Sequence, residues 1–409
     1  MALLDLVALF VVARVFGELC TRVRIPALVG EIGAGIVLGP IAFAFVRPTE
    51  PIKLLADLGV FFIVYEAGME MTLNGVRRII KESGAAVAAG SFTLPFLLGF
   101  LVGTAFDLDI HVSLFLGLAL SLTALPVSVR ILTDFGWVTT DVGQTIITAG
   151  LLCDIAGLTV LAGLANWTSL ARVDPFATTI VVLKIALFFL VVFSMDRVLA
   201  ARDGFLSKRL VAGSEKLLSK AASFSVPMIL VFAFALFAEF LGLHFVIGTF
   251  FGAAIVAEHV FPRREGEHLR ESIAAISHGF LAPLFFGYLG LVAVAVDPAL
   301  APLFVALLLA AVAGKIAGSY VGARFGGFGT WSATVVASAM NGRGAMELVI
   351  ALVGLELGIL SGGLFSILVL LGLITTVMTP FLLRRLARAK ETVFAPATVP
   401  RPADPPGTT

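Results

Sequence analysis

Charged side chains are scarce in this sequence: Asp, Glu, Lys and Arg make up 13% of the 409 residues, about half of the ~25% that is typical of soluble chains. Cysteine is scarcer still, because Cys20 and Cys153 are the only two and both fall in apolar segments. This excludes a disulfide framework and a Cys-x-x-Cys metal site. The His-Glu-x-x-His, P-loop and Gly-x-Ser-x-Gly signatures are also missing. We therefore expect no enzymatic activity, no cofactor and no nucleic-acid partner.

Long apolar runs fill most of the chain. The hydrophobic share is 59% and the mean hydropathy is +1.06, and apolar blocks of about 20 residues, the length of a bilayer-spanning helix, recur throughout. The first block lacks the basic flank and cleavage site of a signal peptide. The sequence predicts an all-α polytopic membrane protein with about 13 transmembrane helices. The predicted spans are residues 2–20, 26–46, 51–71, 84–105, 111–132, 141–166, 175–198, 222–242, 244–260, 275–297, 298–320, 330–358 and 362–386.

Basic residues gather in alternate predicted loops. With the N-terminus outside and the C-terminus in the cytoplasm, the outer loops hold only Arg47, Lys53 and Arg172, and most other Lys and Arg residues fall in cytoplasmic segments. Cytoplasmic loops of membrane proteins carry such an excess, so the asymmetry supports both the orientation and the number of spans. We expect the protein to lie in the lipid bilayer of the cell's inner (plasma) membrane.

The predicted spans divide into two groups of six. Residues 1–198 hold the first six spans and a linker helix, residues 199–221 form a basic amphipathic segment on the cytoplasmic surface, and residues 222–386 hold the second six. The Pro-rich residues 387–409 are expected to be a disordered cytoplasmic tail. Two groups that begin on opposite sides of the membrane would form inverted repeats, a design in which each half carries an interrupted helix.

Helix breakers stand in the fifth span of each half. The first half carries a proline in mid-span, which removes a helical hydrogen bond, and the second half carries two glycines around a cation. A simple kink explains either break alone, but the match between the halves predicts crossing broken helices whose unwound backbone lines a cavity. The predicted breaks comprise Ala124, Leu125, Pro126, Asn341, Gly342 and Gly344.

Asp154 is an acid near the middle of the sixth predicted span. A charge at mid-bilayer costs roughly 3 kcal/mol, so this residue needs a partner or a function. Gly150, Cys153 and Gly157 surround it at helical spacing, and small residues predict a face packed against other helices. One reading is a structural acid satisfied by a hydroxyl or a lysine; the other is a carboxylate that binds a proton or a cation, with Thr123 offering further oxygen atoms.

Three more ionisable residues lie inside the second half. Lys315 either extends its side chain to the interface or forms a salt bridge with Asp154 that a cation or proton breaks. Arg343 and Glu347 are four residues apart, on one helical face, and flank the second break, where we expect them to compensate the charges of the half-helix ends. Glu66 and Glu70 lie near a span end, where solvation at the interface is the simpler account.

The stretches "LTALPVSVRILTDFGWVTTDVGQTIITAGLLCDIAGLTVL" and "MNGRGAMELVIALVGLELGILS" resemble the monovalent cation/proton antiporter superfamily, in particular the branch of Na⁺/H⁺ exchangers and K⁺ efflux antiporters. The similarity extends over residues 1–386. It implies an inverted-repeat fold whose core domain moves like an elevator against a dimerisation domain. It also implies that the essential carboxylate matches Asp154, the broken helices match Thr123–Pro126 and Asn341–Gly344, and a basic residue on the helix before the second break matches Lys315.

Two residues depart from the family pattern. Cys153 stands where relatives usually have Asp, Asn or Gln, and Gly342 stands where proline is frequent. A pair of acids is associated with charge-moving exchange in the family, whereas a cysteine buried in apolar surroundings stays a neutral thiol. The single acid therefore favours electroneutral exchange of one proton for one cation.

The sequence thus predicts a secondary active antiporter that exchanges a monovalent cation (Na⁺, K⁺ or Li⁺) for protons in pH homeostasis, as a homodimer. Three alternatives remain open. A K⁺ efflux channel-like transporter subunit of the same fold would show no obligatory proton coupling. An organic-anion symporter would line its cavity with cationic or amide groups, and a sensor subunit would normally carry a signalling domain. The residues do not specify the cation.

Overall fold

Helices form the secondary structure throughout the part of the chain that the computed structural model describes, which comprises residues 2–23, 25–70, 83–123, 132, 136–137, 140–167, 175–201, 222–259 and 263–389. The first half contains α1 (Ala2–Arg22), α2 (Ala27–Leu38), α3 (Glu50–Glu70), α5 (Ser83–Ala105), α6 (Ile110–Ser121), α8 (Asp141–Trp167) and α9 (Pro175–Ala201). The second half contains α11 (Ala222–Phe240), α12 (Phe245–His259), α13 (Arg263–Ile276), the π-helical turn η1 (Ser277–Leu281), α14 (Ala282–Val292), the 3₁₀ turn η2 (Pro298–Leu300), α15 (Ala301–Phe325), α16 (Thr330–Met340), α17 (Ala345–Glu356) and α18 (Gly362–Ala389).

Each of the 13 predicted spans contains a helix. By length and composition, five helices of the described chain can cross a membrane alone, and the bent pair α16 and α17 makes a sixth span. Four of the other predicted spans correspond to shorter apolar helices, which comprise Ala27–Leu38, Ile110–Ser121, Phe224–Phe240 and Phe245–His259. Most of residues 199–221 and 387–409, predicted as an amphipathic segment and a tail, lie outside the described residues.

Two predicted boundaries are wrong. The second helix ends at Leu38, well before residue 46, because Pro40 disfavours helical geometry at the preceding Gly39. The tenth span was predicted to begin at residue 275, but a helix begins at Arg263 and continues through η1 into α14. The charged stretch of α13 is helical because Leu269 and Ile273, four residues apart, bury one face in an apolar cluster.

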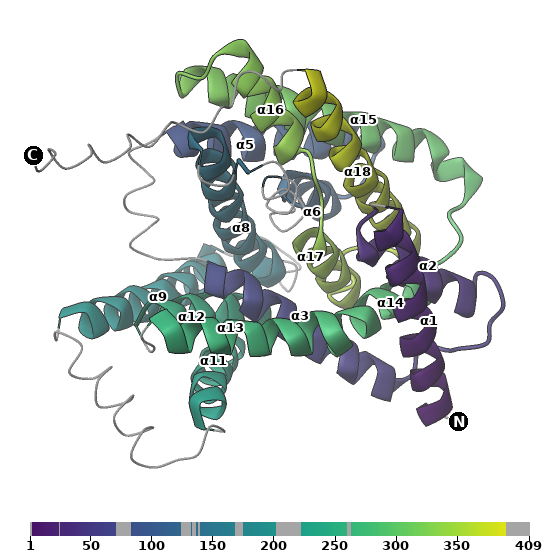
Figure 1. Ribbon diagram of the computed structural model, residues 1–409, viewed down its shortest axis with the longest axis horizontal. Coiled ribbons are helices and arrows are strands. Elements are labelled where there is room, and N and C mark those ends of the chain that lie inside the picture. Colours follow the sequence, from purple (N-terminus) through teal and green to yellow (C-terminus); the bar gives the residue numbers. More distant parts are fainter. Residues whose placement is uncertain are drawn as a thin grey trace, which may run out of the picture.

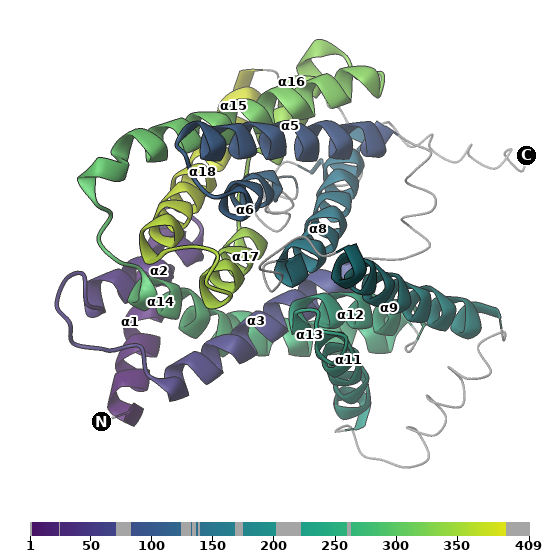
Figure 2. The ribbon, with the colours of Figure 1, turned by 180° about the vertical axis from the view of Figure 1, so that it is seen from behind.

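The helices form two groups, visible in Figure 1 and from behind in Figure 2. The core bundle consists of α5, α6, α8 and α15 to α18, and the panel consists of α1 to α3, α9 and α11 to α14. Between the groups, α17 packs against α3, and α8 packs against α9 and α12. The linker helix α9 thus touches both groups.

The tightest helix crossing joins α5 and α15 at two glycines. A Cβ atom on Gly90 would lie 2.2 Å from the carbonyl oxygen of Gly318, and one on Gly318 would lie 2.1 Å from that of Gly90. No larger residue fits at either position without separating the helices. This close approach brings the middle of α15, with Lys315, against the middle of α5.

The two halves match in local backbone geometry. The turn between α5 and α6 places Asp107 at a positive φ, and the N–H of Leu108 donates to the oxygen of Gly103. The turn between α15 and α16 repeats this arrangement 220 residues later, with Gly327 at a positive φ and Phe328 donating to Ala323. Helix contacts also match: α1 packs on α2 as α11 does on α12, and α2 packs on α14 as α12 does on α3.

Candidate functional site

The second predicted break is present in the core bundle. The helix stops at Met340 and resumes at Ala345, with a bend of 42° between α16 and α17. Asn341, Gly342 and Gly344 therefore lie in non-helical backbone, as predicted. The hydroxyl of Thr376 on α18 donates to the carbonyl oxygen of Arg343 and holds the interrupted segment against the bundle.

Arg343 joins the break to the C-terminal end of α6. Its guanidinium donates to the carbonyl oxygens of Ala119 (3.0 Å) and Leu120 (2.7 Å). Carbonyls at a helix C-terminus lack helical donors and carry partial negative charge. The same guanidinium donates to Glu347 Oε1 at 2.8 Å, and both side chains are buried. Glu347 lies in the first turn of α17. A positive charge therefore lies at the C-terminal end of α6 and a negative charge at the N-terminal end of α17, as the predicted charge compensation requires.

Lys315 is fully buried, so its side chain does not extend to the interface. Its ammonium donates to the carbonyl oxygen of Ser91 on α5 at 3.1 Å and to that of Ser121, the last residue of α6. The acceptor on Ser91 is available because Pro95, four residues later, has no N–H to donate to it. Lys315 and Asp154 form no ion pair, although their charges interact. The role of Lys315 in transport stays a prediction.

Asp154 lies in the middle of α8 and is 3% exposed. Its Oδ1 atom is buried and has no hydrogen-bond partner within the described chain. A buried polar atom without a partner is rare in folded proteins and requires an explanation. Gly157, one turn further along α8, faces the side chain of Leu122, the residue before Thr123. This part of α8 therefore packs against the C-terminal end of α6.

Oxygen-bearing side chains lie beside Cys153, the residue that precedes Asp154 on α8. Cys153 is fully buried, with its sulfur 3.8 Å from the carbonyl oxygen of Ala88, and the hydroxyls of Ser91 and Thr123 lie beside it. The hydroxyl of Thr123 and both amide atoms of Asn341 are buried without partners in the described chain. Hard cations prefer oxygen ligands, so this donor set suits an alkali cation. Ala124, Leu125 and Pro126 lie outside the described residues.

Glu66 and Glu70 pair with residues of the second half. Glu66 Oε2 lies 3.0 Å from His278 Nε2, and Glu70 Oε1 lies 2.9 Å from Arg270. The sequence predicts that water at the membrane interface solvates these two acids. In the structure they are only partly exposed, and ion pairs replace part of that water. The charge of Glu70 also acts on Asp154.

Sequence reasoning missed Ser91, Pro95 and Ser121. Their contribution comes from backbone carbonyl groups, which no side-chain pattern reports. One signal was available: a proline in the middle of the fourth predicted span frees the carbonyl four residues before it. The lysine that uses this carbonyl is 224 residues away, and only the fold brings the two together.

Comparisons with known proteins agree with this architecture. Residues 6–389 match the transmembrane sodium/hydrogen exchanger family. The chain is 30% identical over 382 residues to a probable Na⁺/H⁺ antiporter, GerT of Bacillus cereus, covering 93% of this chain and 98% of the relative. It is 29% identical to the Na⁺/H⁺-K⁺ antiporter GerN of the same organism, covering 92% and 94%.

A solved structure shares the fold. The sodium proton antiporter MjNhaP1 from Methanocaldococcus jannaschii, determined at pH 8, superimposes with a TM-score of 0.64 at 14% identity, covering 95% of this chain and 97% of that one. The apolar helices and the family match together make this a multi-pass membrane protein. The chain belongs to the sodium/hydrogen exchanger family, within the monovalent cation/proton antiporter superfamily.

Proposed function

We propose that this protein exchanges a monovalent cation for protons, with Asp154 binding the two alternately. The observation that carries the proposal is the Oδ1 atom of Asp154, which is buried at mid-helix and has no hydrogen-bond partner among the residues that the structure describes. Thr123 and Asn341 supply further polar atoms that are buried and have no partner in the described part of the chain. The relatives named as Na⁺/H⁺ and Na⁺/H⁺-K⁺ antiporters support the same class of transport.

Alternate occupancy of one carboxylate couples the two fluxes. A charge costs roughly 3 kcal/mol at mid-bilayer, and either a proton or a monovalent cation neutralises Asp154. The neutral forms then cross between the two sides of the membrane, whereas the empty anion does not, which prevents leak. Lys315 and Arg343 already donate to backbone carbonyls, so this arrangement offers little to the organic anion of a symporter.

The test is cation-driven proton movement in liposomes. The purified protein is reconstituted with an internal pH dye, and Na⁺, K⁺ and Li⁺ are added in turn. Asp154→Asn should reduce the dye response to that of empty liposomes. Asp141→Asn is the matched control, because Asp141 is an exposed acid in the first turn of the same helix, and its response should equal the wild type. Cation-driven proton flux in Asp154→Asn would disprove the proposal.

The exchange is proposed to be electroneutral because Cys153 adds no second acid to the site. An imposed membrane potential should then leave the exchange rate unchanged when the pH and cation gradients are fixed. Acceleration by potential would show net charge movement and would refute a 1:1 ratio while leaving cation/proton exchange intact.

The remaining features of the proposal concern assembly. We place residues 1–198 and 222–386 in inverted repeats, which the matched turns at Asp107 and Gly327 support. The protein is proposed to be a homodimer in the plasma membrane, with its N-terminus outside and its C-terminus in the cytoplasm. Membrane-impermeant thiol labelling of single cysteines placed at residues 2 and 409, in a variant without Cys20 and Cys153, tests the orientation.

A further inference from the structure

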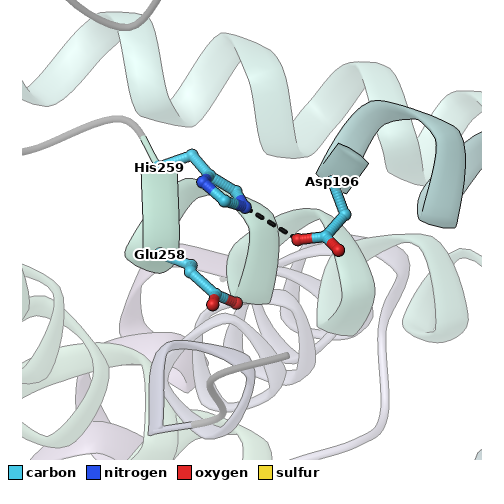
Figure 3. Close-up of side chains that lie close together, drawn as sticks. All are labelled: Asp196, Glu258 and His259. Carbon is cyan, nitrogen blue, oxygen red and sulfur yellow. Dashed lines mark hydrogen bonds and ion pairs between the residues drawn. The ribbon is translucent and has the colours of Figure 1, made fainter. Parts of the chain in front are cut away.

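A second group of ionisable side chains lies in the panel, away from Asp154. Asp196 comes from the last turns of α9, and Glu258 and His259 are the final residues of α12 (Figure 3). One ligand atom of each lies within 4.8 Å of those of the other two. The Nε2 atom of His259 and the Oδ1 atom of Asp196 are 2.7 Å apart, and both side chains are largely buried.

These three side chains form a donor set for a divalent transition cation. An imidazole nitrogen with two carboxylates is a typical ligand combination for Zn²⁺, whose ligand atoms lie at about 2.0–2.2 Å. Ligand atoms around a tetrahedral ion are about 3.4 Å apart, so Nε2 and Oδ1 need to separate by less than ~1 Å to admit it. A nitrogen donor distinguishes this site from the all-oxygen sites of Mg²⁺ and Ca²⁺.

The position of the group in the fold also favours a cation. Glu258 and His259 end α12, and the C-terminus of a helix carries partial negative charge. Each carboxylate carries one negative charge and a metal-binding imidazole is neutral. The two acids and the helix end together therefore balance the charge of a divalent ion. A helix end is a weak attraction alone, but here it adds to three side-chain ligands.

We infer that Asp196, Glu258 and His259 form a binding site for a divalent transition cation of the Zn²⁺ type, with a water completing the coordination. The ion joins α9 to α12. The site thus fixes the linker helix to the panel, and α9 also packs against α8, which carries Asp154.

The test is Zn²⁺ binding to the purified full-length protein in detergent, measured by isothermal titration calorimetry and by metal analysis after dialysis. The wild type should bind one Zn²⁺ per chain, and a tenfold excess of Mg²⁺ should not displace it. His259→Gln and Asp196→Asn should each weaken binding at least about tenfold. Zn²⁺ should also raise the melting temperature of the wild type and leave that of His259→Gln unchanged.

His268→Gln is the matched control. His268 also pairs with an acid, Glu271, at 3.6 Å, but on the exposed surface of α13, and the variant should bind Zn²⁺ like the wild type. Equal binding by all variants, or none by the wild type, would refute the site. Displacement by equimolar Mg²⁺ would refute the transition-metal class. Thermal unfolding measured in EDTA shows whether each metal-free variant is folded, because a variant that fails to fold gives no cooperative transition. If one ligand variant fails to fold, the other ligand variant and the control decide the result.

Discussion

Lys315 donates to the carbonyl oxygen of Ser91, the helical acceptor that Pro95 leaves without a donor. The proline and the lysine lie on different helices and in different halves of the sequence. The proline leaves a buried carbonyl without a helical donor, and the lysine brings a buried ammonium that needs an acceptor. One hydrogen bond satisfies both groups. The close crossing at Gly90 and Gly318 makes the contact possible.

This relationship predicts a rescue. Lys315→Met should lower the free energy of unfolding by about 1–3 kcal/mol, because it leaves the buried carbonyls of Ser91 and Ser121 without a donor. Adding Pro95→Ala restores a helical N–H for Ser91 and should recover part of the loss. Thermal unfolding of the purified variants measures both effects.

Pro227→Ala is the control for this rescue. Pro227 also lies inside a helix, but in α11 of the panel, so its substitution should give no recovery in the Lys315→Met background. Equal recovery with both alanines would show a general gain in helix stability, and the proposed link between Pro95 and Lys315 would be wrong.

The buried pair of Arg343 and Glu347 should be strongly coupled. Arg343→Met removes the donor to two carbonyls and leaves the Glu347 carboxylate uncompensated, which costs about 3–5 kcal/mol. Combining it with Glu347→Leu should cost less than the sum of the two single changes. Chemical or thermal unfolding of the four proteins gives the coupling energy.

An exposed pair with the same spacing provides the comparison. Glu18 and Arg22 are also four residues apart, at 3.7 Å, but on the surface of α1. Arg22→Met should change stability by no more than about 0.5 kcal/mol. Additive effects of Arg343→Met and Glu347→Leu would mean that the pair does not act as a unit.

The helix crossing makes opposite predictions for two Gly→Ala changes. Gly90→Ala places a Cβ atom 2.2 Å from the carbonyl oxygen of Gly318, and overpacking of this kind costs about 1–3 kcal/mol or more. A Cβ atom on Gly33 of α2 would meet no atom of the described residues within 4 Å, so the better helix propensity of alanine should stabilise Gly33→Ala by up to about 1 kcal/mol. Melting temperatures should therefore move in opposite directions, and a stable Gly90→Ala protein would contradict the crossing.

The sequence predicted the helices and the second break better than it predicted the contacts between side chains and backbone. Apolar length identifies a span, and Gly342 and Gly344 mark an interruption, because both signals are local. Lys315 and Arg343 each donate to a backbone carbonyl that is 224 residues away in the sequence, a contact that local patterns do not encode. The site at Asp196, Glu258 and His259 was not predicted for the same reason, because neither Asp196 nor His259 is unusual within its own helix.

Thr123→Val should separate cation binding from stability. The Thr123 hydroxyl is buried without a partner in the described chain, so a methyl group of similar size should leave the melting temperature nearly unchanged. If the hydroxyl is a cation ligand, its loss should raise the cation concentration for half-maximal exchange about tenfold, equivalent to about 1.4 kcal/mol. Thr249→Val is the control, because that hydroxyl donates to Phe245 within α12 of the panel and its loss should leave the half-maximal concentration unaltered. An unchanged value for Thr123→Val would remove Thr123 from the site while leaving Asp154 as the carboxylate on which exchange depends.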